Sequence, residues 1–259
     1  MQFTESQSKW FLLPKPNHNA RLRLFCLPFA GGSADIYKSW ESQLHESIEL
    51  VAIQLPGRGA RFIESPIAEM DLLVEELWRE LKLYTNKPYA LFGHSLGAKV
   101  GFALMQHIRK EGGLLPLHFF ASASVAPHLP SRPPLLHQQN DQMLVESLRE
   151  YGGTPEEVLD NDELMALLFP VLRADFYLAE TYFASIGDPL DVGLSTFGGE
   201  SDDKVLASDL TAWAEHFAGD QAVLKLFSGG HFFIESHTDD LIAQINSVLS
   251  RLLVSTKQT

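Results

Sequence analysis

The sequence predicts an α/β fold, in which helices cover both faces of a mostly parallel, doubly wound sheet. Apolar runs of strand length alternate with amphipathic helical patterns, as expected when parallel strands are joined by crossover helices. The runs are almost continuously apolar, which is typical of strands that are covered on both faces. They lie at residues 22–29, 48–55, 89–92, 117–123, 194–197 and 222–227.

Two helices are predicted in more detail from their ends. Asp71 is expected to cap a helix whose apolar positions are 74, 77, 78 and 81, a spacing of three and four residues. Thr238 is expected to open the last helix, whose first turn holds two aspartates and whose end holds Arg251, as the helix dipole favours. Both helices would pack on the sheet through their apolar faces.

Residues 128–192 interrupt the alternation of strands and helices. The segment begins Pro-rich and continues with two helical patterns, the second of which runs across Pro170. We predict a single domain over residues 1–259, with this segment as a helical insertion that forms a lid at the carboxyl edge of the sheet. Open α/β sheets bind their ligands at that edge. An enlarged ordinary crossover is the alternative.

The composition narrows the classes of function. The 259 residues carry 33 acidic and 20 basic side chains, a formal net charge of −13, which gives no field to attract phosphate backbones. No run approaches the roughly 20 apolar residues of a membrane span, and the N-terminus lacks the pattern of a secretory signal. A single cysteine, Cys26, excludes an intrachain disulfide and a multi-cysteine metal site. We expect a monomeric cytoplasmic protein that binds neither nucleic acid nor membrane and needs no metal or cofactor.

The clearest chemical motif is Gly93-His94-Ser95-Leu96-Gly97, which follows the strand at 89–92 and opens a helical pattern. A G-x-S-x-G sequence between a strand and a helix predicts a nucleophile elbow. The tight turn would lift the Ser95 hydroxyl clear of the sheet edge, beside the N-terminus of a helix. Backbone N–H groups there can stabilise developing negative charge, so we predict Ser95 as a catalytic nucleophile.

A nucleophilic serine needs a base, which follows the acid in the chain order of this motif. His231 lies just after the strand at 222–227, on a loop with two glycines, so it can reach the top of the elbow. We predict His231 as the general base. Among the other histidines we expect His94 to support the turn, and the following to be loop residues that face water: His18, His45, His128, His137 and His216.

The acid is expected in the loop after the strand at 194–197. Asp202 stands three residues after Gly199 and three before Val205, a spacing similar to the G-x-x-D-x-x-V acid loop of α/β hydrolases. We predict that Asp202 holds the imidazole tautomer and stabilises the imidazolium. Asp203 and Glu200 are the alternatives.

An oxyanion hole would complete the site. One donor is the backbone N–H of Leu96, the residue after the nucleophile, and the other comes from the loop after an early strand. That loop reads Pro28-Phe29-Ala30-Gly31-Gly32-Ser33, and we choose the N–H of Ala30, with Phe29 as the alternative. Phosphate binding is a minor interpretation, because the loop lacks the lysine of a P-loop and the spacing of a dinucleotide site.

Taken together, these segments resemble the type II thioesterases, stand-alone α/β hydrolases that accompany nonribosomal peptide and polyketide synthases. The resemblance runs from about residue 24 to the last helix, with the motifs in the order of that family. It is carried by LPFAGGSA at 27–34, QLPGRGAR at 54–61, LFGHSLGA at 91–98, LRADF at 172–176, GGESDD at 198–203 and SGGHFF at 228–233.

The resemblance implies an α/β-hydrolase fold and an editing enzyme of antibiotic or siderophore biosynthesis. Such an enzyme hydrolyses acyl and aminoacyl thioesters from the phosphopantetheine arm of acyl or peptidyl carrier domains. The triad carries over to Ser95, Asp202 and His231, and the oxyanion loop to Phe29-Ala30. Two positions depart from the pattern: Phe29 stands where many members have His, and Lys204 stands where Pro is frequent, which keeps Asp203 open.

Further expectations concern the lid and the partner. The lid residues Met143, Leu148, Leu168 and Phe176 are expected to line an acyl channel, with ordinary core packing as the alternative. Because carrier domains are usually acidic, docking would need a local basic patch, for which we propose Arg58, Arg61, Lys99 and Arg132. A hydrolase of small free esters and a non-catalytic binding protein are the rival functions.

Overall fold

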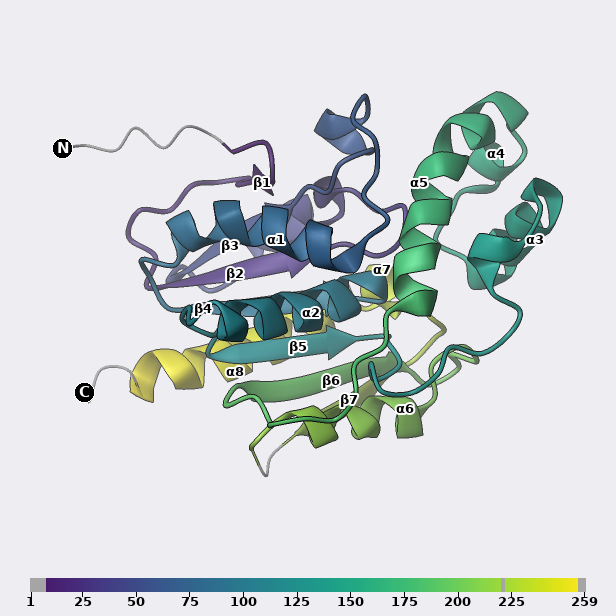
Figure 1. Ribbon diagram of the computed structural model, residues 1–259. Helices are drawn as coiled ribbons and strands as arrows, with labels where there is room; N and C mark the ends of the chain where they lie inside the picture. The colour runs from purple at the N-terminus through teal and green to yellow at the C-terminus, as the bar shows by residue number, and fades with distance from the viewer. Residues whose placement is uncertain (1–7, 220–221, 256–259) are drawn as a thin grey trace.

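The computed structural model describes residues 8–219 and 222–255, which form a seven-stranded sheet in the order β1-β3-β2-β4-β5-β6-β7 (Figure 1). Every neighbouring pair is parallel except β1 with β3. The predicted strands are all present, and the sequence analysis missed β1, which is only two residues long. The strands are β1 Phe11–Leu12, β2 Leu22–Leu27, β3 Ile48–Ile53, β4 Tyr89–His94, β5 His118–Ser122, β6 Gly193–Gly199 and β7 Val223–Phe227.

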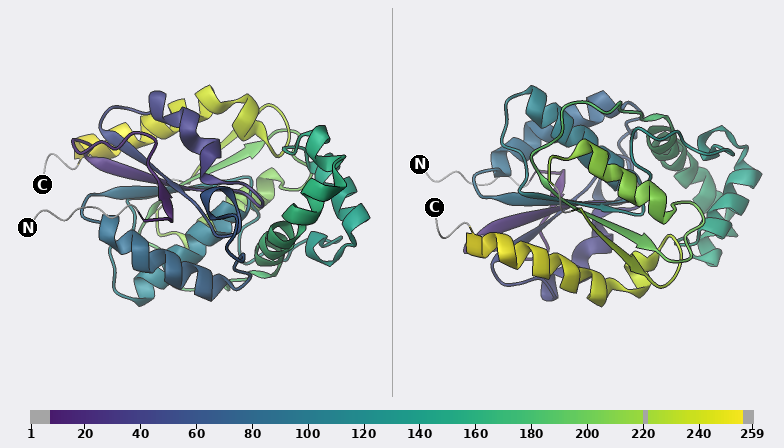
Figure 2. Two further views of the ribbon diagram at one scale, coloured as in Figure 1. Left: turned by 90° about the horizontal axis from the view of Figure 1, so that it is seen from above. Right: turned by 90° about the horizontal axis from the view of Figure 1, so that it is seen from below.

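Helices cover both faces of this sheet (Figure 2). On one face lie α1 (Met70–Leu81), α2 (Leu96–Lys110), α6 (Ala207–Thr211) and the 3₁₀ helix η5 (Ala212–His216). On the other lie η1 (Ala34–Ser42), α7 (Phe233–Ser236) and α8 (Thr238–Ser255). The short helices η2 (Gly59–Arg61) and η3 (Lys82–Tyr84) belong to connections. This is the mostly parallel, doubly wound arrangement that the alternating pattern predicts.

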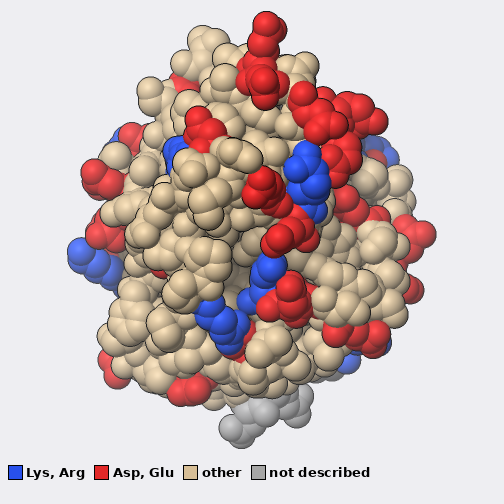
Figure 3. Space-filling view, turned by 90° about the vertical axis from the view of Figure 1, so that its right-hand side faces the viewer, with Lys and Arg blue, Asp and Glu red and all other residues tan. Residues whose placement is uncertain are grey.

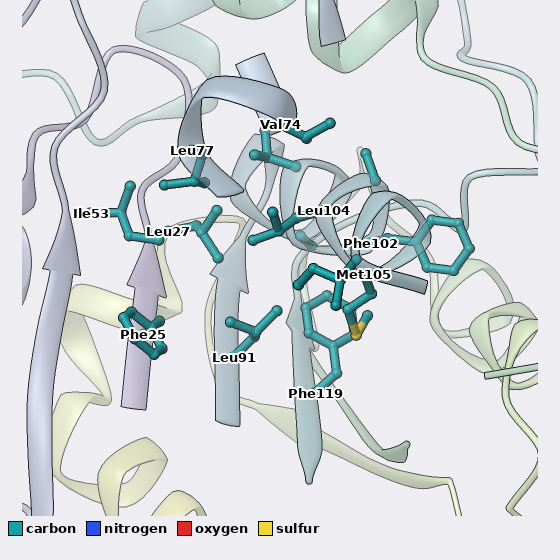
Figure 4. Close-up of a cluster of buried hydrophobic side chains, with 14 of the residues drawn as sticks. Phe25, Leu27, Ile53, Val74, Leu77, Leu91, Phe102, Leu104, Met105 and Phe119 are labelled. Atoms are coloured by element: carbon teal, nitrogen blue, oxygen red, sulfur yellow. The ribbon is translucent and has the colours of Figure 1, made fainter. Parts of the chain in front are cut away.

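Each central strand supplies side chains to two separate cores, because successive residues of a strand point to opposite faces. Phe25, Leu91 and Phe119 point toward α1 and α2 (Figure 4). Their neighbours Leu24 and Ala90 pack instead under η1 and α8. The continuous apolar runs of β2, β4 and β5 are explained by this double burial.

Two local predictions need correction. Asp71 does not cap α1: the N-cap is Glu69, which makes no side-chain capping bond, and Asp71 lies in the first turn, where it can still favour the helix dipole. Strand β7 is not covered on both faces, since Val223 is 48% exposed. The reason is that β7 is the last strand of the sheet. Thr238 begins α8 as expected.

The segment between β5 and β6 holds η4 (Leu136–Gln138), α3 (Asp141–Tyr151), α4 (Glu156–Leu159) and α5 (Asp162–Thr181). These helices lie at the carboxyl ends of the strands, toward which the arrows of the parallel sheet point in Figure 1. They share a small core of their own that includes Leu144, Leu148, Met165 and Leu172. The sequence segment 128–192 therefore builds a helical layer over the edge of the sheet, and its function as a lid stays a prediction. Within the described ranges, no helix has the length and apolar character to cross a membrane.

Candidate active site

The turn from β4 into α2 holds Ser95 in a strained backbone conformation, with φ 55° and ψ −116°. A non-glycine residue pays of order 1–3 kcal/mol for such angles. Both flanking glycines are sterically required. A Cβ on Gly93 would lie 2.2 Å from the carbonyl oxygen of Gly97, and a Cβ on Gly97 would lie 2.3 Å from that of Leu27. The G-x-S-x-G motif thus has glycine at the two positions where backbone packs directly against backbone.

Three side chains from the ends of three strands form a continuous hydrogen-bond chain. Nε2 of His231 lies 3.0 Å from Oγ of Ser95, and Nδ1 of His231 lies 2.8 Å from Oδ2 of Asp202. A carboxylate accepts only, so Nδ1 carries the proton and Nε2 accepts from the serine hydroxyl. Asp202 and His231 are both buried. The structure brings the predicted nucleophile, base and acid into the geometry of a catalytic triad.

The acid loop separates Asp202 from its two alternatives. Oδ1 of Asp202 accepts from the backbone N–H groups of Lys204 and Val205, at 2.9 and 3.2 Å, which leaves Oδ2 directed at His231. Asp203 has a side chain that is 79% exposed and pairs with Lys204. Glu200 accepts from the hydroxyl of Ser228. Of the three acids, Asp202 is the one in contact with His231.

His94 supports the site from below, as expected for a histidine inside the elbow. Its Nε2 donates to the carbonyl oxygen of His231 at 3.1 Å, and its Nδ1 accepts from the hydroxyl of Ser122 at 2.9 Å. Burial lowers the pKa of His94 well below 6.5, and the neighbouring His231 acts in the same direction. His94 is therefore neutral and fixes the backbone of the base.

Two backbone N–H groups beside Ser95 can serve an oxyanion. Leu96 is the first residue of α2, so its N–H has no acceptor within the helix. The N–H of Ala30 has no acceptor among the described residues, and Ala30 lines the same pocket as Ser95. The Phe29 ring packs edge-on against His94 and Phe232, at 5.9 and 5.0 Å between ring centres.

Ser95 and His231 lie between two pockets of different chemistry. The apolar pocket, about 290 Å³, is lined by Phe29, Leu148, Leu168, Leu172 and Phe176 among others. The second pocket, about 330 Å³, also has apolar walls, such as Val125 and Leu136, but it holds more charged and hydroxyl side chains than the first, so we call it the polar pocket. These side chains include Lys99, Ser124, Arg132, Glu150, Glu180 and Lys204. Tyr151 lines both pockets, and its ring stands edge-on to His231 at 5.3 Å. No sequence motif predicts Tyr151, and its only local signal is the Gly152-Gly153 pair after it.

Comparison with known proteins places this chain in a family. The family model described as Thioesterase domain matches residues 22–249. The chain belongs to the thioesterase family. It is 37% identical to Linear gramicidin dehydrogenase LgrE of Brevibacillus parabrevis, over 96% of this chain and 95% of that protein. It is 36% identical to Gramicidin S biosynthesis protein GrsT of Aneurinibacillus migulanus, over 93% and 94%. Among solved structures, the type II thioesterase BorB from the borrelidin biosynthetic cluster superposes with a TM-score of 0.83 at 34% identity, covering 92% of this chain and 96% of BorB.

The predicted lid residues of this thioesterase divide into two groups. Leu148, Leu168 and Phe176 line the apolar pocket. Met143 does not line it: the side chain is 47% exposed, because α3 turns Leu144 and Leu148 inward and Met143 falls on its outer face. The expectation that Met143 contributes to an acyl channel is therefore corrected.

The predicted docking patch of the thioesterase is also corrected. Arg58, Arg61 and Lys99 are all buried: Arg58 pairs with Asp175, Arg61 stacks over the ring of Trp10, and Lys99 donates to a backbone carbonyl of α5. Among these four residues, only the side chain of Arg132 is half exposed, and it pairs with Asp209. Figure 3 shows the side of the molecule on which α3, α4 and α5 lie in Figure 1, where acidic side chains predominate and a few basic ones gather around a central hollow.

Three histidines expected in solvent are instead packed in the thioesterase. His216 is buried and lies 2.9 Å from His128 between ring nitrogens, while His137 pairs with Glu180. Burial lowers the pKa of His216 to about 4, and His128 contributes in the same direction. Within the described residues, no three His, Cys, Asp or Glu side chains are grouped as metal ligands.

Proposed function

We propose that this thioesterase releases acyl and aminoacyl groups from the phosphopantetheine arm of carrier domains in nonribosomal peptide or polyketide synthesis. The observation that carries the proposal is the hydrogen-bond chain from Asp202 through His231 to Ser95, placed between two pockets. Family membership supports a thioester substrate. The similarity to GrsT and BorB, which are named for gramicidin S and borrelidin biosynthesis, supports the carrier-bound form of that substrate.

In the first half of the reaction, Ser95 attacks the thioester carbonyl carbon while Nε2 of His231 takes the hydroxyl proton. The carbonyl oxygen becomes an oxyanion, for which the N–H groups of Leu96 and Ala30 are the proposed donors. Asp202 stabilises the imidazolium. When the C–S bond breaks, His231 returns the proton to the sulfur, so the arm leaves as a free thiol and the acyl group stays on Ser95.

In the second half, a water molecule replaces the thiol. His231 removes a proton from this water as it attacks the acyl-Ser95 carbonyl, and the same pair of N–H groups stabilises the second oxyanion. Collapse of the intermediate breaks the ester bond, the serine oxygen regains its proton from His231, and the carboxylic acid leaves. No group beyond the triad, the backbone donors and water enters this scheme.

The two pockets fit the two parts of such a substrate. The apolar pocket suits the acyl group, because Leu148, Leu168 and Phe176 offer it apolar contacts. The polar pocket suits the arm, a chain of amide and hydroxyl groups that ends in a phosphodiester, since hydroxyl and charged side chains line it. Arg132 and Lys204 are the cations nearest to solvent among its lining residues. Both parts would meet at Ser95.

The name of one relative, LgrE, denotes a dehydrogenase. Nicotinamide binding by a parallel sheet relies on a G-x-G-x-x-G loop after the first strand of the unit. The corresponding loop here, Pro28 to Ser33, has only the adjacent pair Gly31-Gly32, and the N–H of Gly31 is already bound to a carboxylate. We therefore do not extend that activity to this chain.

The decisive experiment follows acyl release from carrier domains that bear a panel of acyl groups, by intact mass. Ser95→Ala is expected to abolish most of the release and to prevent formation of an acylated enzyme. Ser39→Ala, at an exposed serine of η1, is the matched control and should keep the full rate. Release that survives in Ser95→Ala would contradict the assignment of the nucleophile.

The same enzyme preparation distinguishes hydrolysis of carrier-bound thioesters from the rival function, hydrolysis of small free esters. A carrier-directed enzyme should show a higher kcat/KM for the carrier-bound acyl group than for a simple ester or free thioester of the same acid, because only the former fills both pockets. Equal or reversed kcat/KM values would favour a hydrolase of small free esters.

A further inference from the structure

A buried carboxylate of α5 connects this helix to two loops, the one before η1 through a hydrogen bond and the one before η2 through an ion pair. Asp175 of α5 is only 1% exposed, and its Oδ2 accepts from the N–H of Gly31 at 2.7 Å and from the Arg58 guanidinium. Arg58 also donates to the carbonyl oxygen of Pro56 at 2.6 Å. Gly31, Arg58 and Asp175 come from LPFAGGSA, QLPGRGAR and LRADF. The hydrolytic mechanism leaves Arg58 and Asp175 without a role.

The arrangement is poorly explained as a device for stability alone. Placing a carboxylate in the interior costs free energy, and burial raises the pKa of Asp175 although Arg58 and the Gly31 amide oppose it. Nε of Arg58 is buried and has no hydrogen-bond partner among the residues that the structure describes, so the pair is also incompletely satisfied. A pair of apolar side chains would avoid both costs. What apolar side chains could not do is hold the N–H of Gly31 in a fixed direction.

That N–H belongs to the residue directly after Ala30, the proposed oxyanion donor. Gly31 has φ +76°, and a Cβ there would lie 2.9 Å from Leu172 of α5, so the loop also touches the helix closely. One turn beyond Asp175, the carbonyl oxygen of Ala179 accepts from Lys99 of α2 at 2.6 Å. The C-terminal half of α5 is thus hydrogen-bonded to both parts of the oxyanion hole. It binds the loop that carries Ala30, and it binds α2, which begins with Leu96.

We propose that Asp175 is a positioning residue for the oxyanion hole, which it holds in register by binding the Gly31 N–H while Arg58 fixes the carboxylate. The residue touches no substrate and acts through the loop. Because it belongs to α5, the helical layer over the site becomes a supporting part of the catalytic frame as well as a cover. This inference rests on the proposed function only because the carrier-bound thioester is the substrate assayed. Any acyl transfer through Ser95 would use the same oxyanion hole.

The test compares three variants with the unaltered protein. Asp175→Ala removes both contacts and is expected to lower kcat by about 10²–10³, the effect of losing one oxyanion donor, with KM changed less than threefold. Asp175→Asn keeps an acceptor for the Gly31 N–H and should recover at least tenfold of that loss. Glu49→Gln breaks another buried ion pair, Arg23 with Glu49 in β2 and β3, and should lower stability while leaving kcat intact.

A second measurement separates positioning from folding. An alkylboronic acid forms a tetrahedral adduct on a nucleophilic serine, so its Kd reports the oxyanion hole directly. Asp175→Ala should weaken this binding by about 10²-fold relative to Glu49→Gln at matched thermal stability. The proposal is overturned if Asp175→Ala keeps kcat and the boronic acid Kd within threefold, or if Glu49→Gln shows the same losses. The variants are assayed on an activated ester as well as on the carrier-bound substrate. The ester requires Ser95 and its oxyanion hole but no carrier, so the role of Asp175 can be tested even if the protein does not act on carrier domains.

Discussion

At the scale of single residues, the site depends on backbone geometry as much as on its reactive side chains. Ser95 has a positive φ that its neighbours impose, and His231 is held through its carbonyl oxygen by His94 as well as through its ring by Asp202. Because each contact fixes one degree of freedom of the base, loss of any one should reduce the rate without changing the fold.

Asp202 offers the sharpest test at this scale. Asp202→Asn should lower kcat by up to about 10⁴, since an amide can stabilise the wrong imidazole tautomer and cannot balance the imidazolium. Asp203→Asn, one residue away on an exposed side chain, is the matched control and should stay within twofold. Both are checked by steady-state kinetics on a carrier-bound acyl group. A large loss in Asp203→Asn with a small one in Asp202→Asn would reverse the assignment.

Sequence spacing is informative for residues that come shortly after a predicted strand, and misleading for cations whose position in the chain carries no such structural signal. Ser95 and His231 follow predicted strands directly, so their approach could be inferred from strand order. Arg58 and Lys99 were expected in solvent as cations, yet they lie buried against α5, 117 and 80 residues away. No local pattern encodes such a partner, because only the folded chain brings the two segments together.

At the scale of elements, α5 combines two tasks. Leu168 and Phe176 line the apolar pocket, and Asp175 binds the loop beside Ala30. Periodicity predicted this helix and the segment that contains it. It could not predict which turn faces the pocket, which is why Met143 of α3 was misassigned while Leu148, Leu168 and Phe176 do line it. The two-residue strand β1 was missed for a related reason, since two residues show no period.

Enlarging the apolar pocket should change the choice of acyl group. Leu168→Ala removes three carbons from the wall, space for about two methylenes, and each buried methylene is worth about 0.8 kcal/mol. The ratio of kcat/KM for a long over a short acyl chain should therefore rise by roughly tenfold. Leu167→Ala, at a neighbouring side chain that is 57% exposed, is the control. Competition between carriers with different acyl chains gives the ratio directly, and an unchanged preference in Leu168→Ala would remove this pocket from the acyl site.

At the scale of the whole molecule, the net charge of −13 becomes a constraint on the partner. The average field would repel an acidic carrier domain, and three of the four basic residues once assigned to docking are internal. A carrier domain of the proposed kind would then need local cations, and Arg132 and Lys204 are the most exposed cations that line the polar pocket. The sequence could not show which basic residues are available for docking, because the ion pairs and stacking contacts that bury Arg58 and Arg61 form only in the folded chain.

The buried histidines make the free energy of unfolding of the whole domain depend on pH. Burial lowers the pKa of His118 in β5 to about 4, with a smaller contribution from Arg251, while an unfolded chain keeps the ordinary value of 6.5. As the pH falls below 6.5, the unfolded chain therefore binds a proton that the folded protein does not, and the free energy of unfolding decreases until about pH 4. His216 acts in the same direction. For one such group the loss amounts to about 2 kcal/mol between pH 7.5 and pH 5.

Replacing His118 by glutamine tests this directly, because the amide can keep the contact with Ser195, whose Oγ lies 2.9 Å from Nε2, but cannot titrate. Urea unfolding at pH 7.5 measures the structural effect of His118→Gln, since the histidine is neutral in both states there. At pH 5 the unaltered protein should have lost about 2 kcal/mol more than the variant. A difference between the two proteins that stays constant from pH 7.5 to pH 5 would show that His118 does not contribute to acid sensitivity, and the same comparison at His216 would then test whether that histidine does.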